Sequence, residues 1–289
     1  MEPLATGYGL IEGPVWDAAR GLLFSDVIGG GVFCFSPATG KVEPVLEHRR
    51  GIGGMALHGN GGLIVSGRNI SWKGAGPDEA AVLLDREEIP AAVGFNDLTT
   101  DPEGRIYVGS LAFSPVGAEE EPKPGQLHLI DLDGPTRVLA DGIMLTNGLG
   151  VSPDGSKLYH SDSLSGGVFV YDRTPDGSVG ERRLFGPVSG GHADGLALST
   201  DGAVWVAVAG GGCVIAFNPD GSERTRLPVP LPMVTSVCFG GDDLRDLYVV
   251  TGSRGADNDR AGNVYRTRTE VPGLPVSPAR VRIDRQAGA

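Results

Sequence analysis

Cysteine is scarce in this sequence, and long apolar runs are missing. The three cysteines, Cys34, Cys213 and Cys238, are an odd number and stand in apolar, strand-like segments. They are expected to be small core residues rather than a disulfide framework or a metal knuckle, which favours a reducing compartment, most simply the cytoplasm. No apolar run approaches the ~18 residues of a membrane span. Residues 1–5 lack the basic and apolar regions of a signal peptide.

Basic residues are outnumbered as well, because 24 Lys and Arg stand against 36 Asp and Glu, a net charge of −12. Such a chain repels phosphate backbones and anionic lipids, so we expect a small-molecule substrate and neither a nucleic-acid nor a membrane partner. The glycine run at residues 210–212 lies between two apolar strand-like runs and predicts no nucleotide-binding loop. No Gly-x-Ser-x-Gly motif appears in the strand–turn–helix context of a serine hydrolase.

Glycine, by contrast, is abundant. The 289 residues include 47 glycines and 21 prolines, without a collagen-like period. Apolar residues make up 40% and charged residues 21%, which are the proportions of a globular protein. The excess of glycine therefore predicts many turns, and many turns imply many short strands.

One unit recurs six times along the chain. Each copy has a small or polar start, an apolar run, a turn rich in Pro, Asp or Gly, and a second apolar run. The copies begin at Glu12, Gly53, Asn96, Asn147, Asp194 and Thr235, at intervals of 41 to 51 residues. Each interval holds four strand signals, and four strands repeated at a near-constant period are typical of a β-propeller.

We therefore predict an all-β fold, a six-bladed β-propeller with four antiparallel strands per blade, as one domain over residues 1–289. Residues 4–13 are similar in sequence to residues 139–148, an expected outer strand that crosses to the next blade. The N-terminal strand is therefore expected to join the last blade beside residues 263–266 and close the ring. The proline-containing tail, residues 271–289, is expected to wrap the surface or fray. A two-sheet sandwich would explain the strands but not their period.

The first residue of each unit is expected to face the central channel at one depth. Four of these six residues carry carboxylate or amide oxygens: Glu12, Asn96, Asn147 and Asp194. Such groups are costly to bury unless paired, and a hard divalent cation would satisfy them together. Ca²⁺ is the ion we expect, with Mg²⁺, Mn²⁺ and Zn²⁺ as alternatives. The other interpretation is that Asn and Asp only cap strand starts and turns.

Several motifs around these positions resemble those of a known family. They are Glu12-Gly13-Pro14-Val15-Trp16, Asn96-Asp97, Thr146-Asn147-Gly148 and Ala193-Asp194-Gly195. Over residues 4–268 the chain resembles the senescence-marker-protein/gluconolactonase/luciferin-regenerating family of six-bladed propeller lactonases. The resemblance implies that Glu12, Asn96, Asn147 and Asp194 bind one divalent metal ion, which assists hydrolysis of sugar lactones. It also implies that Asp194 is the catalytic acid–base.

The chain departs from this family at two substrate positions. Sugar-lactonase members typically have an arginine where Gly94 stands and a glutamate near the position of Ser114. We therefore expect a substrate with fewer hydroxyl groups than a sugar lactone. Arg68 is a candidate to replace the missing arginine, and Trp72 to floor an apolar pocket. The candidate substrate contacts are Arg68, Trp72, Phe95, Phe113, Met144 and His192.

Other readings of the same sequence remain open. The metal would equally serve phosphotriester hydrolysis, or a lyase, isomerase or cyclase step through an enolate, and a propeller without a metal would be a binding scaffold. His160 is expected in the core, and His48, His58 and His128 at solvent or strand edges. Residues 73–80 and 114–125 are expected to be loops at the channel mouth, either as lids or as plain surface. The sequence does not indicate an oligomeric state.

Overall fold

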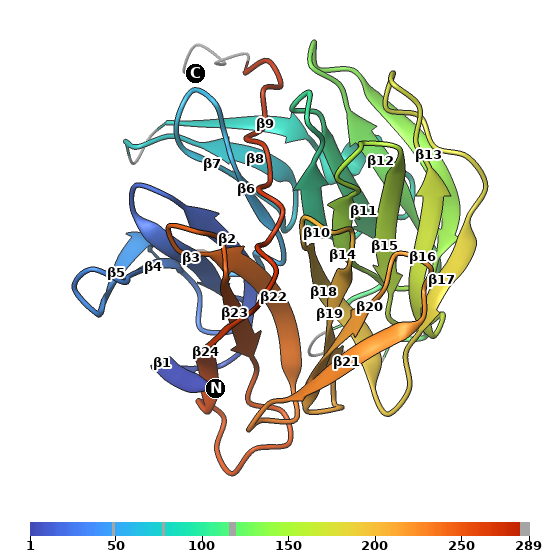
Figure 1. The fold of residues 1–289 in the computed structure, drawn as a ribbon. Helices are drawn as coiled ribbons and strands as arrows, with labels where there is room; N and C mark the ends of the chain where they lie inside the picture. The colour runs from blue at the N-terminus through green and yellow to red at the C-terminus, as the bar shows by residue number, and fades with distance from the viewer. Residues whose placement is uncertain (48–49, 77–78, 116–119, 284–289) are drawn as a thin grey trace.

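The computed structural model describes residues 1–47, 50–76, 79–115 and 120–283. In this part of the chain, 24 strands form six antiparallel sheets of four strands each, arranged around a central axis (Figure 1). One 3₁₀ turn, η1 (Arg86–Glu88), is the sole helical element of the described residues. The prediction of an all-β, six-bladed propeller is confirmed. His48 lies outside the described residues, as do parts of the loops at 73–80 and 114–125.

Each blade runs from an inner strand at the axis to an outer strand at the rim. The first contains β2 (Ile11–Asp17), β3 (Gly21–Asp26), β4 (Val32–Ser36) and β5 (Lys41–Leu46). The second contains β6 (Met55–Leu57), β7 (Leu63–Val65), β8 (Ile70–Lys73) and β9 (Ala80–Leu84). The third contains β10 (Gly94–Thr100), β11 (Ile106–Leu111), β12 (Gly125–Ile130) and β13 (Thr136–Ile143).

The remaining blades follow the same order until the ring closes. The fourth contains β14 (Thr146–Val151), β15 (Lys157–Asp162), β16 (Gly167–Asp172) and β17 (Arg183–Pro187). The fifth contains β18 (His192–Leu198), β19 (Val204–Ala209), β20 (Cys213–Phe217) and β21 (Glu223–Pro228). The sixth contains β22 (Val234–Gly240), β23 (Asp246–Thr251) and β24 (Gly262–Arg268), and its outer strand is β1 (Glu2–Tyr8).

Pairing of β1 with β24 closes the ring, as predicted. The two strands are antiparallel, with Glu2 opposite Arg266 and Thr6 opposite Asn263. The same pairing covers the outer edge of β24, which would otherwise expose unpaired backbone groups.

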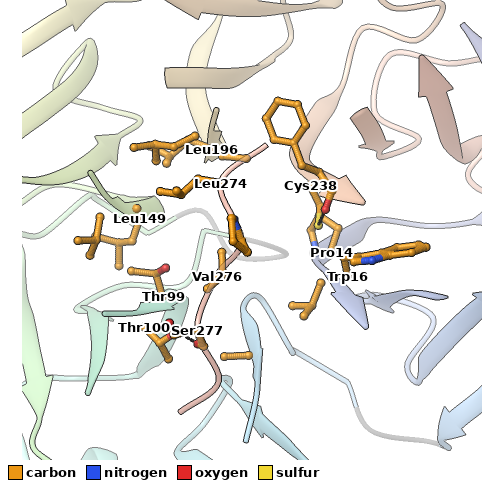
Figure 2. A pocket seen from close by; sticks show the side chains of 18 of the residues that line it. Pro14, Trp16, Thr99, Thr100, Leu149, Leu196, Cys238, Leu274, Val276 and Ser277 are labelled. Atoms are coloured by element: carbon orange, nitrogen blue, oxygen red, sulfur yellow. Dashed lines mark hydrogen bonds between the residues drawn. The ribbon is translucent and has the colours of Figure 1, made fainter. Parts of the chain in front are cut away.

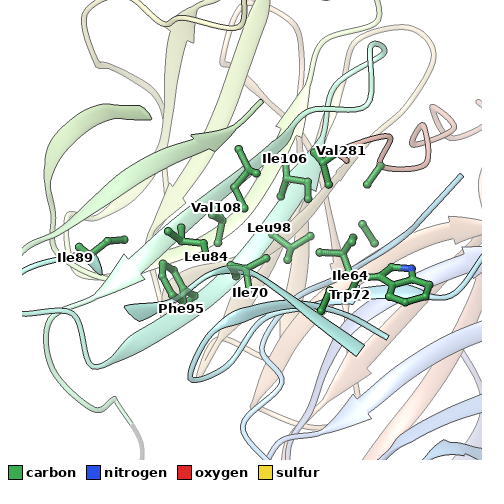
Figure 3. Close-up of a cluster of buried hydrophobic side chains, with 14 residues drawn as sticks. Ile64, Ile70, Trp72, Leu84, Ile89, Phe95, Leu98, Ile106, Val108 and Val281 are labelled. Carbon is green, nitrogen blue, oxygen red and sulfur yellow. The ribbon is translucent and has the colours of Figure 1, made fainter. Parts of the chain in front are cut away.

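The hydrophobic core is divided among the blade interfaces. Each of six clusters of buried side chains joins two neighbouring blades. In the cluster between the second and third blades, Ile64 and Trp72 pack with Ile106 and Val108 (Figure 3). Because successive side chains of a strand point to opposite faces of its sheet, each blade buries apolar residues on both sides. The blades are therefore held in a fixed order around the axis.

The C-terminal segment, residues 271–283, crosses one end of the propeller (Figure 1). We call it the strap. Its backbone bonds first to the fifth and sixth blades, with Leu274 N donating to Leu198 O at 2.7 Å, and later to the second, with Ala279 N donating to Leu57 O at 2.8 Å. Val281 is buried between the second and third blades (Figure 3). This segment of the tail therefore packs across the propeller and does not fray.

No helix among the described residues is long and apolar enough to cross a membrane.

Candidate metal centre

The inner strands carry an irregularity at the positions where the sequence places the oxygen ligands. Pairing of β10 with β11 stops at Phe95 and resumes at Leu98, which leaves Asn96 between them. The same interruption occurs between Thr146 and Leu149 and between Ala193 and Leu196. In β2 it follows Glu12 itself. Bulges of this kind change the direction of side chains. Here they fall at the residues that are predicted to face the channel.

The four predicted ligands stand at the same end of their strands. Glu12 and Asn96 are partly buried, whereas Asn147 and Asp194 are 8% and 5% exposed. Asn96 and Asn147 are in direct contact, because Asn96 Nδ2 donates to Asn147 Oδ1 at 2.9 Å. The charge of Asp194 raises the pKa of Glu12. We call these four residues the ring.

Glycine at position 53 makes room for one ligand oxygen. Gly53 is the second blade's residue at this level, and a Cβ built on it would lie 2.2 Å from Asn96 Oδ1. Any other side chain would push the Asn96 amide away from the axis. Glycine at position 53 therefore allows Asn96 of the neighbouring blade to serve as a ligand.

A third carboxylate, Asp97, lies beside the two acidic ring residues. Burial and the charges of Asp194 and Asp97 raise the pKa of Glu12 well above its usual value. Burial and the charge of Asp97 raise that of Asp194 in the same way. Burial raises the pKa of Asp97 to about 7, although the Leu98 amide donates to its carboxylate. The three buried carboxyl groups therefore disfavour one another's negative charge, which a nearby cation would offset.

The donor set fits a hard divalent cation. Within the described residues, Asp194 Oδ1 is buried without a hydrogen-bond partner, an arrangement that a cation would relieve. The same residues contain no group of three His, Cys, Asp or Glu side chains in metal-binding geometry. The ring instead combines two carboxylates with two amides, which suits Ca²⁺ or Mg²⁺ better than a soft metal.

Two candidate substrate contacts, Met144 and His192, lie at the end of the channel where the inner strands begin. Met144 stands in the turn before β14, where its backbone N donates to Asp162 Oδ2 at 3.0 Å. His192 opens β18, two residues before Asp194, and its side chain is exposed. Its Nδ1 lies 3.0 Å from Ser163 O. Because a carbonyl only accepts, Nδ1 carries the hydrogen, and Nε2 of the neutral ring is free to accept one.

Arg68 stands next to the position where the family's arginine is missing. A Cβ on Gly94 would lie 2.8 Å from Gly67 O and 3.8 Å from the Cα of Arg68. The turn between β7 and β8 therefore occupies the space that a side chain at 94 would need. The exposed guanidinium of Arg68 pairs with Glu87 at 3.2 Å.

Three further candidates are buried. Phe95 and Trp72 belong to the core cluster between the second and third blades, and Trp72 Nε1 donates to Gly61 O at 3.0 Å. Phe113 is 5% exposed in the segment after β11. The structure therefore does not bring Phe95 or Trp72 to the ring, since both fill a blade interface. His160 is buried in the core as expected, but His58 and His128 are buried too, contrary to expectation.

A cavity of about 620 Å³ occupies the channel between the ring and the strap (Figure 2). Its walls are mostly apolar and include Pro14, Leu149 and Leu196, while Leu274 and Val276 of the strap cover its end. Asp97 lines it, but none of the four ring residues does among the described lining residues. The cavity is therefore separate from the surface that Met144 and His192 face.

Three polar residues with notable contacts escaped the sequence reasoning. Asp97 could have been found from the sequence, since it directly follows the ring residue Asn96. Ser163 had no such signal, because it stands after the second strand of the fourth blade, outside the repeated start motif, and contacts Asn147 only in the folded chain. Glu120 was part of an apparently solvated acidic run, yet its carboxylate accepts from Ser114 N at 3.1 Å. An acidic group thus reaches the position where the sequence has serine.

The fold and the ring together define a class, the six-bladed propellers with an oxygen-donor centre on their axis. Residues 10–253 match the sequence profile described as SMP-30/Gluconolactonase/LRE-like region. The chain belongs to this family, in agreement with the resemblance seen in its motifs.

Similar proteins align over nearly the whole chain. A 6-deoxy-6-sulfogluconolactonase of Pseudomonas putida is 33% identical, over 91% of this chain and 92% of its own. Pentonolactonase XacC of Haloferax volcanii is 31% identical, over 96% and 97%. A luciferin-regenerating enzyme is a close structural match, with a TM-score of 0.86, 25% identity, and coverage of 97% of this chain and 99% of that one.

Proposed function

We propose that this protein is a divalent-metal-dependent hydrolase that opens a lactone or a related cyclic ester. The observation that carries the proposal is the ring itself, two carboxylates and two amides at one level of the channel with a buried Asp194 oxygen that lacks a partner among the described residues. Family membership and the names of the lactonase relatives support the reaction class.

Glu12, Asn96, Asn147 and Asp194 would hold the metal ion, with Ca²⁺ as the expected ion. A bound divalent cation supplies Lewis acidity, which stabilises negative charge on the carbonyl oxygen of an ester under attack. Asp194 is the proposed general base: it takes a proton from the water that attacks the acyl carbon. It then returns a proton to the alkoxy oxygen of the lactone as the acyl C–O bond breaks, which gives a hydroxy acid.

The substrate is proposed to be less hydroxylated than a sugar lactone. The proposed apolar contacts are Met144, in the turn before β14, and the 42% exposed Leu164, which follows Ser163 in the chain. Arg68 beside Gly94 is the proposed partner of the substrate's polar end, and His192 Nε2 is a proposed acceptor for one substrate hydroxyl or water. Phe113, Phe95 and Trp72 are buried, so we propose no direct contact for them.

The first test is metal analysis of the purified protein, followed by lactone hydrolysis before and after chelation and after metal add-back. About one equivalent of metal and hydrolysis that returns with Ca²⁺ or another single ion support the proposal. Bound metal without hydrolysis of any lactone would redirect the site to phosphotriester, lyase or isomerase chemistry. Absence of metal from a protein that still folds would leave a binding scaffold.

The second test separates the acid–base role from metal binding. Asp194→Asn keeps an oxygen ligand but removes the base, so hydrolysis should fall by at least ~10²-fold while folding is retained. The matched control is Asp172→Asn on the exposed rim of the fourth blade, which should hydrolyse at the wild-type rate. Wild-type hydrolysis by Asp194→Asn would refute the assignment.

A panel of γ- and δ-lactones of equal ring size, with and without hydroxyl groups, tests the substrate class. The proposal expects a higher kcat/KM for the less hydroxylated member of each pair. Arg68→Met should raise KM more than it lowers kcat. A consistent preference for polyhydroxylated lactones would refute this part of the proposal alone.

A further inference from the structure

The two amide ligands of the ring present a chemical ambiguity. An asparagine side chain binds a cation through Oδ1 and repels it through Nδ2, and the two ends are nearly equal in shape. A 180° rotation of either amide would therefore turn a ligand into a repulsive group. Something in the protein must fix which end faces the axis.

The hydroxyl of Ser163 supplies that constraint. Ser163 is 4% exposed, directly after β15, and its Oγ donates to Ala193 O at 2.6 Å. Because a carbonyl only accepts, the single hydroxyl hydrogen is used in this bond. Ser163 Oγ is then available only as an acceptor, and Asn147 Nδ2 donates to it at 2.8 Å. The NH₂ end of Asn147 must face Ser163, and Oδ1 must face the axis.

The orientation passes on to the second amide. Asn147 Oδ1 accepts from Asn96 Nδ2 at 2.9 Å, and Asn96 Nδ2 also donates to Thr146 O at 2.8 Å. Both hydrogens of the Asn96 amide are therefore committed, and its Oδ1 is left toward Gly53 and the channel. Rotating Asn147 would place two NH₂ groups against each other and leave the Ala193 carbonyl without its hydroxyl donor.

We infer that Ser163 is a positioning residue which sets the orientation of both amide ligands in the ring. It joins the ligand of the fourth blade to the residue before Asp194 in the fifth, and it reaches the third blade through Asn147. This inference rests on the proposed function, because it assumes that the ring binds a cation.

The test measures metal affinity directly, independently of hydrolysis. Metal-free wild type is titrated calorimetrically with Ca²⁺, Mg²⁺, Mn²⁺ and Zn²⁺, and the tightest ion is used for all variants. Ser163→Ala is expected to weaken binding about 10- to 100-fold, the range found when a partner of a metal ligand is removed. Ser161→Ala is the matched control, since Ser161 Oγ is buried on β15 and has no hydrogen-bond partner in the described residues. Its affinity should equal that of wild type.

A double-mutant cycle separates orientation from general damage. In an Asn147→Asp background both terminal atoms are oxygens, so rotation no longer matters. Adding Ser163→Ala to Asn147→Asp should then change the affinity by less than ~2-fold. An equal loss in both backgrounds, or no loss in Ser163→Ala alone, would overturn the inference while the proposed function stands. If wild type binds none of the four ions, both fail together.

A measurement on the unsubstituted ligand covers the case in which Ser163→Ala does not fold. The side-chain NH₂ signal of Asn147 in ¹⁵N-labelled protein is identified by its absence from Asn147→Asp. Its hydrogens are expected to exchange slowly with solvent, and to remain slow after the metal is added. Exchange as fast as that of a surface amide would contradict the bond to Ser163.

Discussion

Arg173 joins the third and fourth blades through a buried ion cluster, and its replacement gives a sharp test of the packing. The residue follows β16, and its side chain is 4% exposed. Arg173 Nη2 donates to Asp101 Oδ2 at 2.5 Å and to Glu103 Oε2 at 2.6 Å, both in the turn after β10. Its Nε donates to Tyr107 OH at 2.8 Å. The perturbation is Arg173→Met, which keeps bulk and removes every donor.

The expected loss follows from the partners that remain. Breaking a buried ion pair from one side costs about 3–5 kcal/mol, because the other charge stays buried. Asp101 is fully buried, but it keeps Arg105 Nη1 at 3.0 Å and the amide of Gly104 at 2.8 Å. Glu103 reaches solvent and can rehydrate. We therefore expect a loss at the lower end, about 3 kcal/mol in the free energy of unfolding.

Urea unfolding of metal-free protein measures this loss as a lower midpoint at constant slope. Arg183→Met is the matched control in the same blade: its bidentate pair with Asp172 is exposed, so its midpoint should stay near that of wild type. Metal affinity should be unchanged in both variants, because the cluster lies at the opposite end of β10 from Asn96. Equal midpoints for Arg173→Met and Arg183→Met would refute the reasoning.

Three further predictions concern buried groups away from the ring. Burial lowers the pKa of His128 to about 4, whereas an unfolded histidine titrates near 6.5. Its stabilising contribution is nearly complete above pH 6.5 and is lost as the pH falls toward 4, with about 2 kcal/mol of the loss between pH 7 and 5. Unfolding of wild type and His128→Gln at these two pH values measures the loss, and parallel losses in the two proteins would contradict the prediction. Trp72→Ala should lower the free energy of unfolding by about 3–5 kcal/mol and leave KM unchanged, whereas a raised KM in steady-state kinetics would return Trp72 to the substrate pocket. Val281→Ala removes two buried methyl groups of the strap and should cost about 2 kcal/mol in urea unfolding, so a wild-type midpoint would show that the strap is not packed in solution.

The repeat made the propeller and the ring predictable. Six units at a near-constant period require six similar blades, and equivalent positions of similar blades must meet at one depth around the axis. Glu12, Asn96, Asn147 and Asp194 could therefore be placed together without any knowledge of their contacts. Closure by β1 followed in the same way from the parallel between residues 4–13 and 139–148.

The sequence did not show whether each remaining side chain points toward the channel or into the interface between two blades. Trp72 and Phe95 stand near the ends of strands and resemble pocket residues, but the side chains point into the interface between two blades. His58 and His128 were expected near solvent for want of any neighbour in sequence, and their partners, Val281 O and Ser110 Oγ, come from other segments. Ser163 lies 16 residues after Asn147, on the far side of β15, and no periodicity in the sequence marks their contact.

The pairing of β1 with β24 has a consequence for how the protein is made. On the ribosome β1 emerges before every other strand described here, and its partner follows at residue 262. At 5–20 residues per second this strand waits on the order of tens of seconds for its partner. Until β24 arrives, the sixth blade is incomplete and the blades form an open arc.

The four ring residues cannot come together before that moment. Thr235 Oγ1 of the sixth blade donates to Ile11 O at 2.6 Å, which fixes the backbone beside Glu12. This contact and the buried cluster between the first and sixth blades bring Glu12 around to the same end of the channel as Asp194. An arrested nascent chain without the sixth blade would hold Asn96, Asn147 and Asp194 near one another but not Glu12, so a cation that needs all four residues would bind only after closure.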